Sequence, residues 1–196
     1  MRCDFYEVTD NKGAETYKRI PIQEGDVILG DRGYCHREGV AHVLREKGDV
    51  IVRLNSTSFP LLDDKEDVAF EILAHLRRPR GHQPGEWPVR FEANEEHWPS
   101  RLCAIRKSQH AAELAKEKIL QEASRKQTGL RPETLEFAEY TFVLVSVPIG
   151  ELEVAEALDL YRARWQIELC FKRLKSLFQL GHVPKRSDDS ARAWIE

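Results

Sequence analysis

The sequence predicts an α/β fold with a partly parallel sheet, and three features of the chain support this prediction. Short apolar runs rich in β-branched residues alternate with helical patterns over residues 1–55. A stretch rich in proline, glycine and charge follows, and a long helical pattern lies near the C-terminal end. The order strand, helix, strand, helix, strand is typical of an α/β domain, because helices connect neighbouring parallel strands.

Residues 1–55 contain the strands and helices expected on one side of the sheet. Residues 3–9 alternate between polar and apolar side chains, as a half-buried strand does. The apolar run Val27–Leu29 predicts a short buried strand that Gly30 stops. Apolar side chains at helical spacing predict a helix over residues 37–48, where a glycine ends it, and residues 49–55 predict the next strand.

The middle of the chain, residues 56–148, predicts an inserted subdomain that contains strands. Five of the nine prolines lie between residues 56 and 100, which favours loops and short strands there. Residues 101–108 alternate like a strand, and residues 110–127 form a highly charged helical pattern with an apolar stripe. The β-branched run 141–147 predicts a further strand that a proline ends.

A last long helix is expected to begin near residues 151–154 and to end near Leu180. Gly181 and Pro184 follow it, and both residue types are typical of a helix end. Residues 1–55 and 149–196 therefore predict one core domain, which the segment 56–148 interrupts.

The composition excludes membrane and secreted proteins. Hydrophobic residues make up 41% of the chain and charged residues 32%, without an apolar run long enough to span a bilayer. The N-terminal residues do not resemble a signal peptide, so we expect a cytoplasmic protein. The four cysteines and seven histidines are scattered, which favours free thiols and gives no zinc-binding pattern.

The charge is distributed unevenly. Residues 161–196 contain eight lysines or arginines and four acidic residues, so they carry +4. The whole chain carries −3, and the segment 1–160 therefore carries −7. A basic segment on an acidic body suggests one face that binds a polyanion.

Four polar side chains share one face of the last predicted helix. On a helical wheel of about 100° per residue, Tyr161, Arg164, Glu168 and Lys175 fall within a stripe about 60° wide. Apolar residues lie on both sides of this stripe, which predicts that the helix packs into its domain and that the stripe lines a cleft. The alternative is an ordinary surface ion pair between Arg164 and Glu168, four residues apart.

A second acid, Asp31, follows the predicted strand Val27–Leu29 in the sequence LGDRGY. Gly30 and Gly33 permit tight backbone turns on either side of it. In α/β folds, ligands bind at the carboxyl ends of the strands, which makes Asp31 a candidate ligand-binding residue. The alternative is an acid in a surface loop.

The spacing of Tyr161, Arg164, Glu168 and Lys175 matches the pattern Y-x2-R-x3-E-x6-K. This pattern resembles the signature of the Y-R-E-K branch of the insertion-sequence-four family of DDE transposases. The segments LGDRGY, LYRARWQIELCFKRLKSL and TFVLVSVP are also similar to that family. The resemblance implies a ribonuclease-H-like (retroviral-integrase-like) mixed sheet with flanking helices, incomplete at the N-terminus, and a strand-containing insertion before the last long helix.

The resemblance also implies the chemistry. Asp31 and Glu168 would be the second and third acids of a triad that binds two Mg²⁺ or Mn²⁺ ions, which prefer oxygen ligands. Tyr161, Arg164 and Lys175 would hold phosphates of the transposon ends. Cut-and-paste transposition of an insertion sequence would follow, with transposon ends and target DNA as partners, a homodimer as the full-length enzyme and the bacterial nucleoid as the location. An aromatic residue of the insertion would receive a flipped base, with Trp87, Trp98 and Phe142 as open candidates.

The first acid of the triad has no obvious counterpart here. Asp31 lies close to the start of the chain, and neither Asp4 nor Asp10 leaves room for a hairpin and a helix before it. We therefore expect a truncated fragment that is inactive alone. Two alternatives remain open: a non-catalytic remnant that binds DNA ends or inhibits the full-length transposase, and a different ribonuclease-H-like nuclease.

Overall fold

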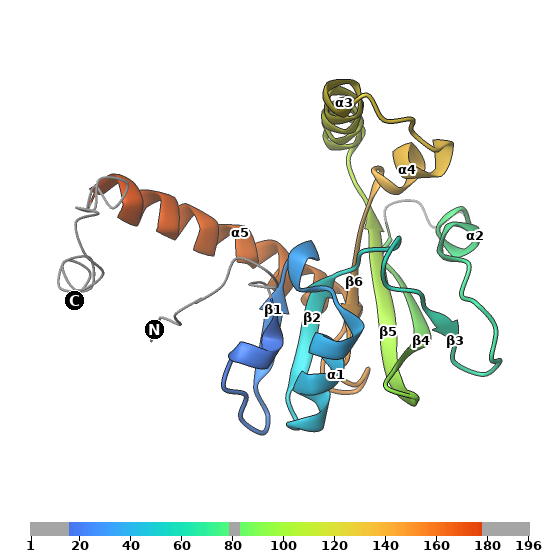
Figure 1. The fold of residues 1–196 in the computed structure, drawn as a ribbon, viewed down its shortest axis with the longest axis vertical. Coiled ribbons are helices and arrows are strands. Elements are labelled where there is room, and N and C mark those ends of the chain that lie inside the picture. The colour runs from blue at the N-terminus through green and yellow to red at the C-terminus, as the bar shows by residue number, and fades with distance from the viewer. Residues whose placement is uncertain (1–15, 79–82, 178–196) are drawn as a thin grey trace. The chain divides into compact units, whose positions relative to one another are not determined.

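The structure is a computed structural model, and it describes residues 16–78 and 83–177. Figure 1 shows how the helices and strands are arranged. In chain order they are the 3-10 helix η1 (Tyr17–Arg19), β1 (Val27–Gly30), the 3-10 helix η2 (Arg32–Tyr34), α1 (Arg37–Arg45), β2 (Asp49–Arg53), β3 (Leu62–Asp63), α2 (Ile72–Leu76), β4 (Gly85–Ala93), β5 (Glu96–Arg106), α3 (Gln109–Lys126), α4 (Pro132–Phe137), β6 (Tyr140–Val145) and α5 (Val154–Leu177). The strand predicted over residues 3–9 lies outside the described residues, as does the end of the last predicted helix beyond Leu177.

The six strands form one mixed sheet in the order β1-β2-β6-β5-β4-β3. β1 and β2 are parallel and α1 connects them, whereas each of the other pairs is antiparallel. These strands and helices confirm the predicted α/β class and its partly parallel sheet.

Strand β6 lies between β2 and β5, although β3, β4 and β5 all separate it from β2 in the sequence. Ile51 of β2 pairs with Val145 of β6, and Val145 pairs with Arg101 of β5. The strands expected within residues 56–148 therefore extend the same sheet that β1 and β2 begin. The division of the chain into core, insertion and core stays a prediction.

The sheet buries apolar side chains on both faces. On one face, Val50 and Val52 of β2 join a large core with α1, Tyr17 and Phe59. On the other face, Ile51 joins a smaller core with β6 and the first turns of α5, including Tyr161. Side chains alternate across a strand, so β2 contributes to both cores and is buried throughout its centre.

Strand β4 is longer than the proline-rich sequence predicted. Alternate residues of its nine are buried, among them Val89 and Phe91. Pro88 is tolerated because β3 pairs only with Val89 and Arg90, so β4 is an edge strand at Pro88. Pro99 of β5 likewise lies beyond the residues that pair with β6, which begin at Arg101.

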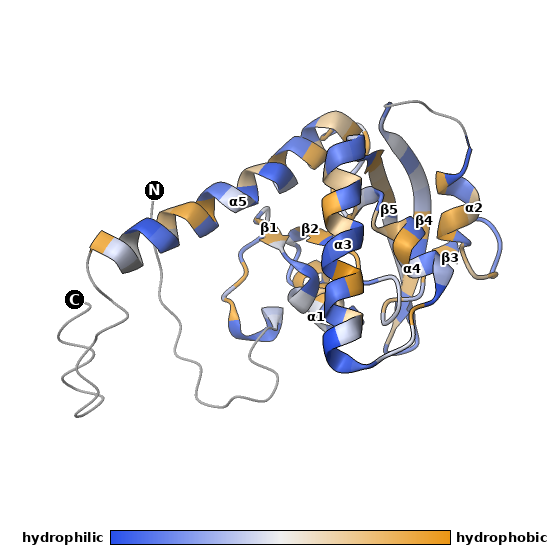
Figure 2. Cartoon of the chain, turned by 90° about the horizontal axis from the view of Figure 1, so that it is seen from above, coloured by the Kyte–Doolittle hydropathy of each residue, from blue (hydrophilic) through white to orange (hydrophobic). Residues whose placement is uncertain are grey.

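The structure confirms the predicted helices α1 and α3. The chain leaves α1 at Lys47, whose φ of 61° is left-handed, rather than at the predicted glycine. Gly48 is still required there, because a Cβ atom would lie 2.7 Å from Ile22 Cγ2. Helix α3 buries Ala123 and lies with α4 beyond the carboxyl end of β5 (Figures 1 and 2).

The chain divides into two compact units, residues 1–161 and 162–196, with the boundary inside α5. Cys35 and Cys103 are buried free thiols, as predicted, whereas Cys170 is an exposed one and Cys3 lies outside the described residues. Across the two described ranges, no helix has an apolar stretch long enough to cross a lipid bilayer.

Candidate functional site

Asp31 lies at the carboxyl end of β1 and is half-buried. Its Oδ1 accepts a hydrogen bond from the backbone N–H of Gly33 at 2.8 Å and thereby caps η2. Its Oδ2 accepts no hydrogen bond from any residue that the structure describes. The cap fixes the carboxylate and leaves one oxygen available for a cation or water.

The backbone before Asp31 packs tightly against a buried tyrosine. A Cβ atom at Gly30 would lie 1.9 Å from the Tyr17 hydroxyl oxygen, so only glycine fits at this position. Burial, and then the nearby Cys35 and Asp31, raise the pKa of Tyr17, so its hydroxyl stays protonated. Asp31 therefore belongs to a packed strand end and not to a loose surface loop.

Three cationic residues end strands at the same edge of the sheet. Arg32 follows β1, Arg53 is the last residue of β2, and Lys107 follows β5. These three strands run in the same direction, because β6 is antiparallel to both β2 and β5. Burial, and then Arg53 and Arg32, lower the pKa of Lys107 to about 8. Neither Arg53 nor Lys107 was a candidate from the sequence, although each lies near the end of a predicted strand.

Tyr161 lies in the core and not in an open polar stripe. It is 8% exposed and belongs to the apolar cluster of Ile51, Val143 and Val145. The expectation that Tyr161 and its stripe line a cleft is therefore wrong for this residue. Its ring packs against the sheet because it faces the same way as Ala157 and Leu158, which are also buried.

Arg164 and Glu168 form the ion pair that their spacing predicts. Arg164 Nη1 lies 2.7 Å from Glu168 Oε1, and the two side chains are 24% and 52% exposed. Glu168 Oε2 accepts no hydrogen bond from the described residues. Like Asp31, Glu168 has one oxygen held by a nearby donor and one oxygen available.

Two of the apolar residues that flank the stripe are exposed, whereas Leu158 is buried and Leu169 is half-buried. Trp165 is 51% exposed and Ile167 is 42% exposed, so the prediction that the helix is packed on both sides is wrong for these two residues. Lys175 lies on α5, but its side chain is outside the described part of the structure.

Asp31 belongs to the unit of residues 1–161, and Glu168 belongs to the unit of residues 162–196. Their predicted convergence on one cation site therefore stays a prediction. Within residues 16–78 and 83–177, no three acidic, histidine or cysteine side chains form a cluster that could hold a metal ion.

Among the aromatic candidates for a flipped base, Trp87 and Phe142 are almost buried, at 8% and 6% exposure. Trp98 is half-buried, and the Arg45 guanidinium carbon lies 5.4 Å from its ring centroid. The choice among the three remains open.

Comparison with known proteins identifies the DDE transposase family that the resemblance implied. A family model described as "Transposase DDE domain" matches residues 2–196. The "Transposase for insertion sequence element IS421" of Escherichia coli is 33% identical over 201 residues, which cover 98% of this chain and 54% of that protein. InsL for insertion sequence element IS186A, from Escherichia coli strain K12, has the same identity and coverage.

The chain thus spans about half the length of the curated relatives that it matches. The family match, by contrast, extends over nearly the whole chain. The chain therefore belongs to the family of transposase DDE domains.

Proposed function

We propose that this chain is part of a DNA transposase that cuts and joins DNA at the ends of an insertion sequence. The observation that carries the proposal is Asp31, a capped carboxylate with an available oxygen at the carboxyl end of a parallel strand. The relatives' names and the family match supply the reaction class. The ribonuclease-H-like form of the sheet and the Y-R-E-K branch belong to the same proposal.

In this proposal, Asp31 and Glu168 together bind Mg²⁺ or Mn²⁺. Carboxylate oxygens suit these hard cations, and each of the two residues has one oxygen without a protein donor among the described residues. Divalent ions bound there would polarise the phosphodiester and activate the attacking oxygen.

The side chains around these acids have separate tasks. The Gly33 N–H holds the Asp31 carboxylate in one orientation, and Arg164 does the same for Glu168. In the proposal, Arg164 and Lys175 bind phosphates of the transposon end, Arg164 through its planar guanidinium group and Lys175 as a point charge. Tyr161 fixes the first turns of α5 in the core, with its ring against the sheet.

Iron-dependent backbone cleavage tests the metal site without requiring DNA cleavage. Fe²⁺ replaces Mg²⁺ at oxygen-rich sites, and with ascorbate and peroxide it generates radicals that cut the adjacent backbone. We expect cuts beside Asp31 and beside Glu168, competition by Mg²⁺, and loss of both cuts in Asp31→Asn and in Glu168→Gln. Asp64→Asn and Glu117→Gln remove exposed acids elsewhere and should change nothing. Cuts that persist in both site variants would refute the shared metal site.

DNA cleavage tests the enzymatic role. Incubation with Mg²⁺ or Mn²⁺ and a duplex of the element's own terminal sequence should give no product if the chain alone lacks an acid, as the sequence predicts. Strong cleavage that Glu168→Gln abolishes would contradict that expectation and would show a complete active site. If the chain binds the duplex but shows no iron-dependent cleavage of its own backbone, the alternative is favoured, namely a protein that binds DNA ends or inhibits the transposase.

A further inference from the structure

We propose that a groove between helices α3 and α4 and the carboxyl edge of the sheet binds the phosphate backbone of DNA. This inference rests on the proposed function, and it adds a DNA-binding surface that Tyr161, Arg164 and Lys175 do not supply. All of its residues belong to the unit of residues 1–161, whereas Arg164 and Lys175 belong to the other unit.

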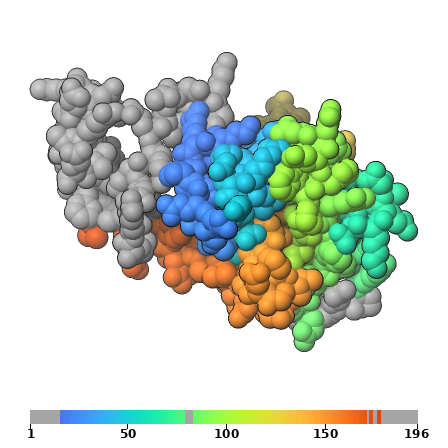
Figure 3. All heavy atoms as spheres, turned by 90° about the horizontal axis from the view of Figure 1, so that it is seen from below, coloured from blue at the N-terminus to red at the C-terminus, as the bar shows by residue number. Residues whose placement is uncertain are grey.

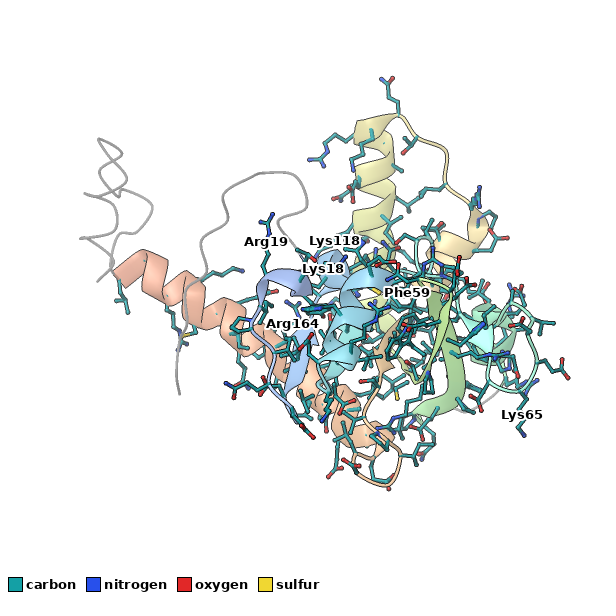
Figure 4. The ribbon with its side chains drawn as sticks, turned by 60° about the horizontal axis from the view of Figure 1, so that its bottom comes forward. Lys18, Arg19, Phe59, Lys65, Lys118 and Arg164 are labelled. Atoms are coloured by element: carbon teal, nitrogen blue, oxygen red, sulfur yellow. The ribbon has the colours of Figure 1, made fainter. Side chains whose placement is uncertain are left out.

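The groove has a volume of about 990 Å³, and its walls come from four parts of the chain. Arg32 and Arg53 lie at the strand ends, Lys107 follows β5, and Lys118 and Arg131 extend the positive charge along α3 and in front of α4. Figure 2 shows α3 crossing above the ends of the strands, and Figure 4 shows the Lys118 side chain on it. The groove thus lies at the edge of the sheet that also carries Asp31.

The charge of the groove is strongly positive. Its lining includes five lysines and arginines but only two acids, Glu122 and Glu133. Glu122 is already paired with Lys126, 2.6 Å away. A polyanion would therefore meet an excess of positive charge along the whole groove.

The groove cations lack the partners that other cations of this chain have. Arg45, Arg77 and Arg106 each form an ion pair with a glutamate. By contrast, none of the five groove cations forms an ion pair with a residue of the described ranges. The Lys107 ammonium group donates only to a backbone carbonyl, that of Ala138, at 2.7 Å. Unpaired cations in one place are what a binding site for an external anion requires.

These cations also repel one another. Burial, and then the charges of Arg53 and Arg32, lower the pKa of Lys107. Arg53 and Lys107 are half-buried. Like charges at such positions cost free energy in the absence of an anion, and phosphate groups would remove that cost. The cost favours a functional role for the cluster, because a solvated surface would gain nothing from such crowding.

The position of the groove favours DNA over a small anion. Arg32 adjoins Asp31 in the sequence, and the cations continue from it to α3 and α4. One phosphate would engage two or three of them, whereas a DNA strand has phosphates for all five. The half-buried Phe137 and the buried Phe142 add an apolar surface that suits the sugar between two phosphates.

Fluorescence anisotropy with a labelled 30-base-pair duplex, in EDTA and over a salt series, tests the proposal. We expect Arg53→Gln, Lys107→Gln and Lys118→Gln each to weaken binding several-fold, and each to reduce the slope of log K against log salt by about 0.9. Lys65→Gln removes an exposed charge far from Lys118 (Figure 4) and should leave both quantities unchanged. Lys118 is exposed on α3, so its variant should keep the fold even where a variant at the sheet edge does not.

Unchanged affinity and slope in all three variants would overturn the proposal. It would also fail if inorganic tripolyphosphate displaced the duplex at the same phosphate concentration, because that would indicate a small-anion site. EDTA separates this test from the proposed metal chemistry. If Asp31→Asn and Glu168→Gln bind the duplex normally while iron-dependent cleavage shows no site, the groove stands and only the metal proposal fails.

Discussion

Arg101 is a buried cation that ties the sheet to the start of α5, and its replacement should destabilise the chain. The side chain is 3% exposed in all, and its Nε donates to the Val147 carbonyl at 2.8 Å. The other guanidinium nitrogens donate to Glu86 and to the Leu152 carbonyl. Figure 3 shows β4 and β5 and the segment after β6 side by side at this end of the sheet.

The contacts of Arg101 set the size of the effect in Arg101→Met. Two carbonyl oxygens would lose their donor at about 1–3 kcal/mol each, and Glu86 would lose its partner. Breaking a buried ion pair by removing one partner costs about 3–5 kcal/mol in total, and the buried methionine would recover about 1.5–3 kcal/mol. We expect a net loss of about 2 kcal/mol, which lowers Tm by about 4–8 °C in a chain of this length.

Thermal unfolding followed by circular dichroism measures this loss, and Arg106→Met is the matched control. Arg106 lies on the same strand, but its side chain is 56% exposed and its partner Glu139 also pairs with Lys116. An exposed pair contributes at most about 1 kcal/mol, so the control should lower Tm by no more than about 4 °C. Hydrogen exchange should also accelerate in the first turn of α5 in Arg101→Met alone. Equal Tm changes in the two variants would refute the reasoning.

Three further predictions concern the groove and the core. Lys107 becomes neutral as pH rises through about 8, while Arg32 and Arg53, which face it, stay charged. Duplex affinity should therefore fall several-fold from pH 7 to pH 9, by about as much as the substitution Lys107→Gln lowers it at pH 7. The fall should be absent in Lys107→Gln, and an equal fall in that variant would exclude Lys107 as its cause. Phe59→Ala should lower the free energy of unfolding, measured in urea, by about 3–5 kcal/mol, because the Phe59 ring is fully buried and its centroid lies 4.9 Å from that of Phe91. A loss below about 1 kcal/mol would contradict this packing. Gly30→Ala should cost about 1–3 kcal/mol through its clash with the Tyr17 hydroxyl, and Tyr17→Phe in the same chain should reduce that cost; additive effects of the two changes would argue against the clash.

Local sequence predicts a strand or helix well where its apolar residues recur at regular spacing and where a glycine or proline marks its end. β1, α1 and β2 were found because apolar spacing and glycine agree there. β4 was underestimated because a proline normally excludes a central strand, and the sequence does not show that β4 is an edge strand at Pro88. Pro88 is tolerated in β4 because of how β4 pairs with β3 in the sheet, and local sequence does not specify which strands pair.

Local sequence predicted only those parts of the candidate site that depend on neighbouring residues. Asp31 follows a strand that the sequence identifies, and the Arg164–Glu168 pair follows from helical spacing. Arg53 and Lys107 lie far apart in the sequence, and only the insertion of β6 between β2 and β5 brings their strand ends to one edge. Tyr161 was assigned to a polar stripe because a helical wheel gives a direction but not the surface that the helix packs against.

The place of β6 has a consequence for synthesis of the chain on the ribosome. Ile51 of β2 cannot pair with Val145 of β6 until Val145 has been translated, which happens only after β3, β4, β5, α3 and α4. At roughly 5–20 residues per second, this delay lasts roughly 5–20 seconds. During that time the backbone groups on one side of β2 are open to any other extended chain, including a second nascent copy on the same messenger. Translation speed and chaperone binding over this interval should therefore influence how much of the newly made protein reaches the native sheet.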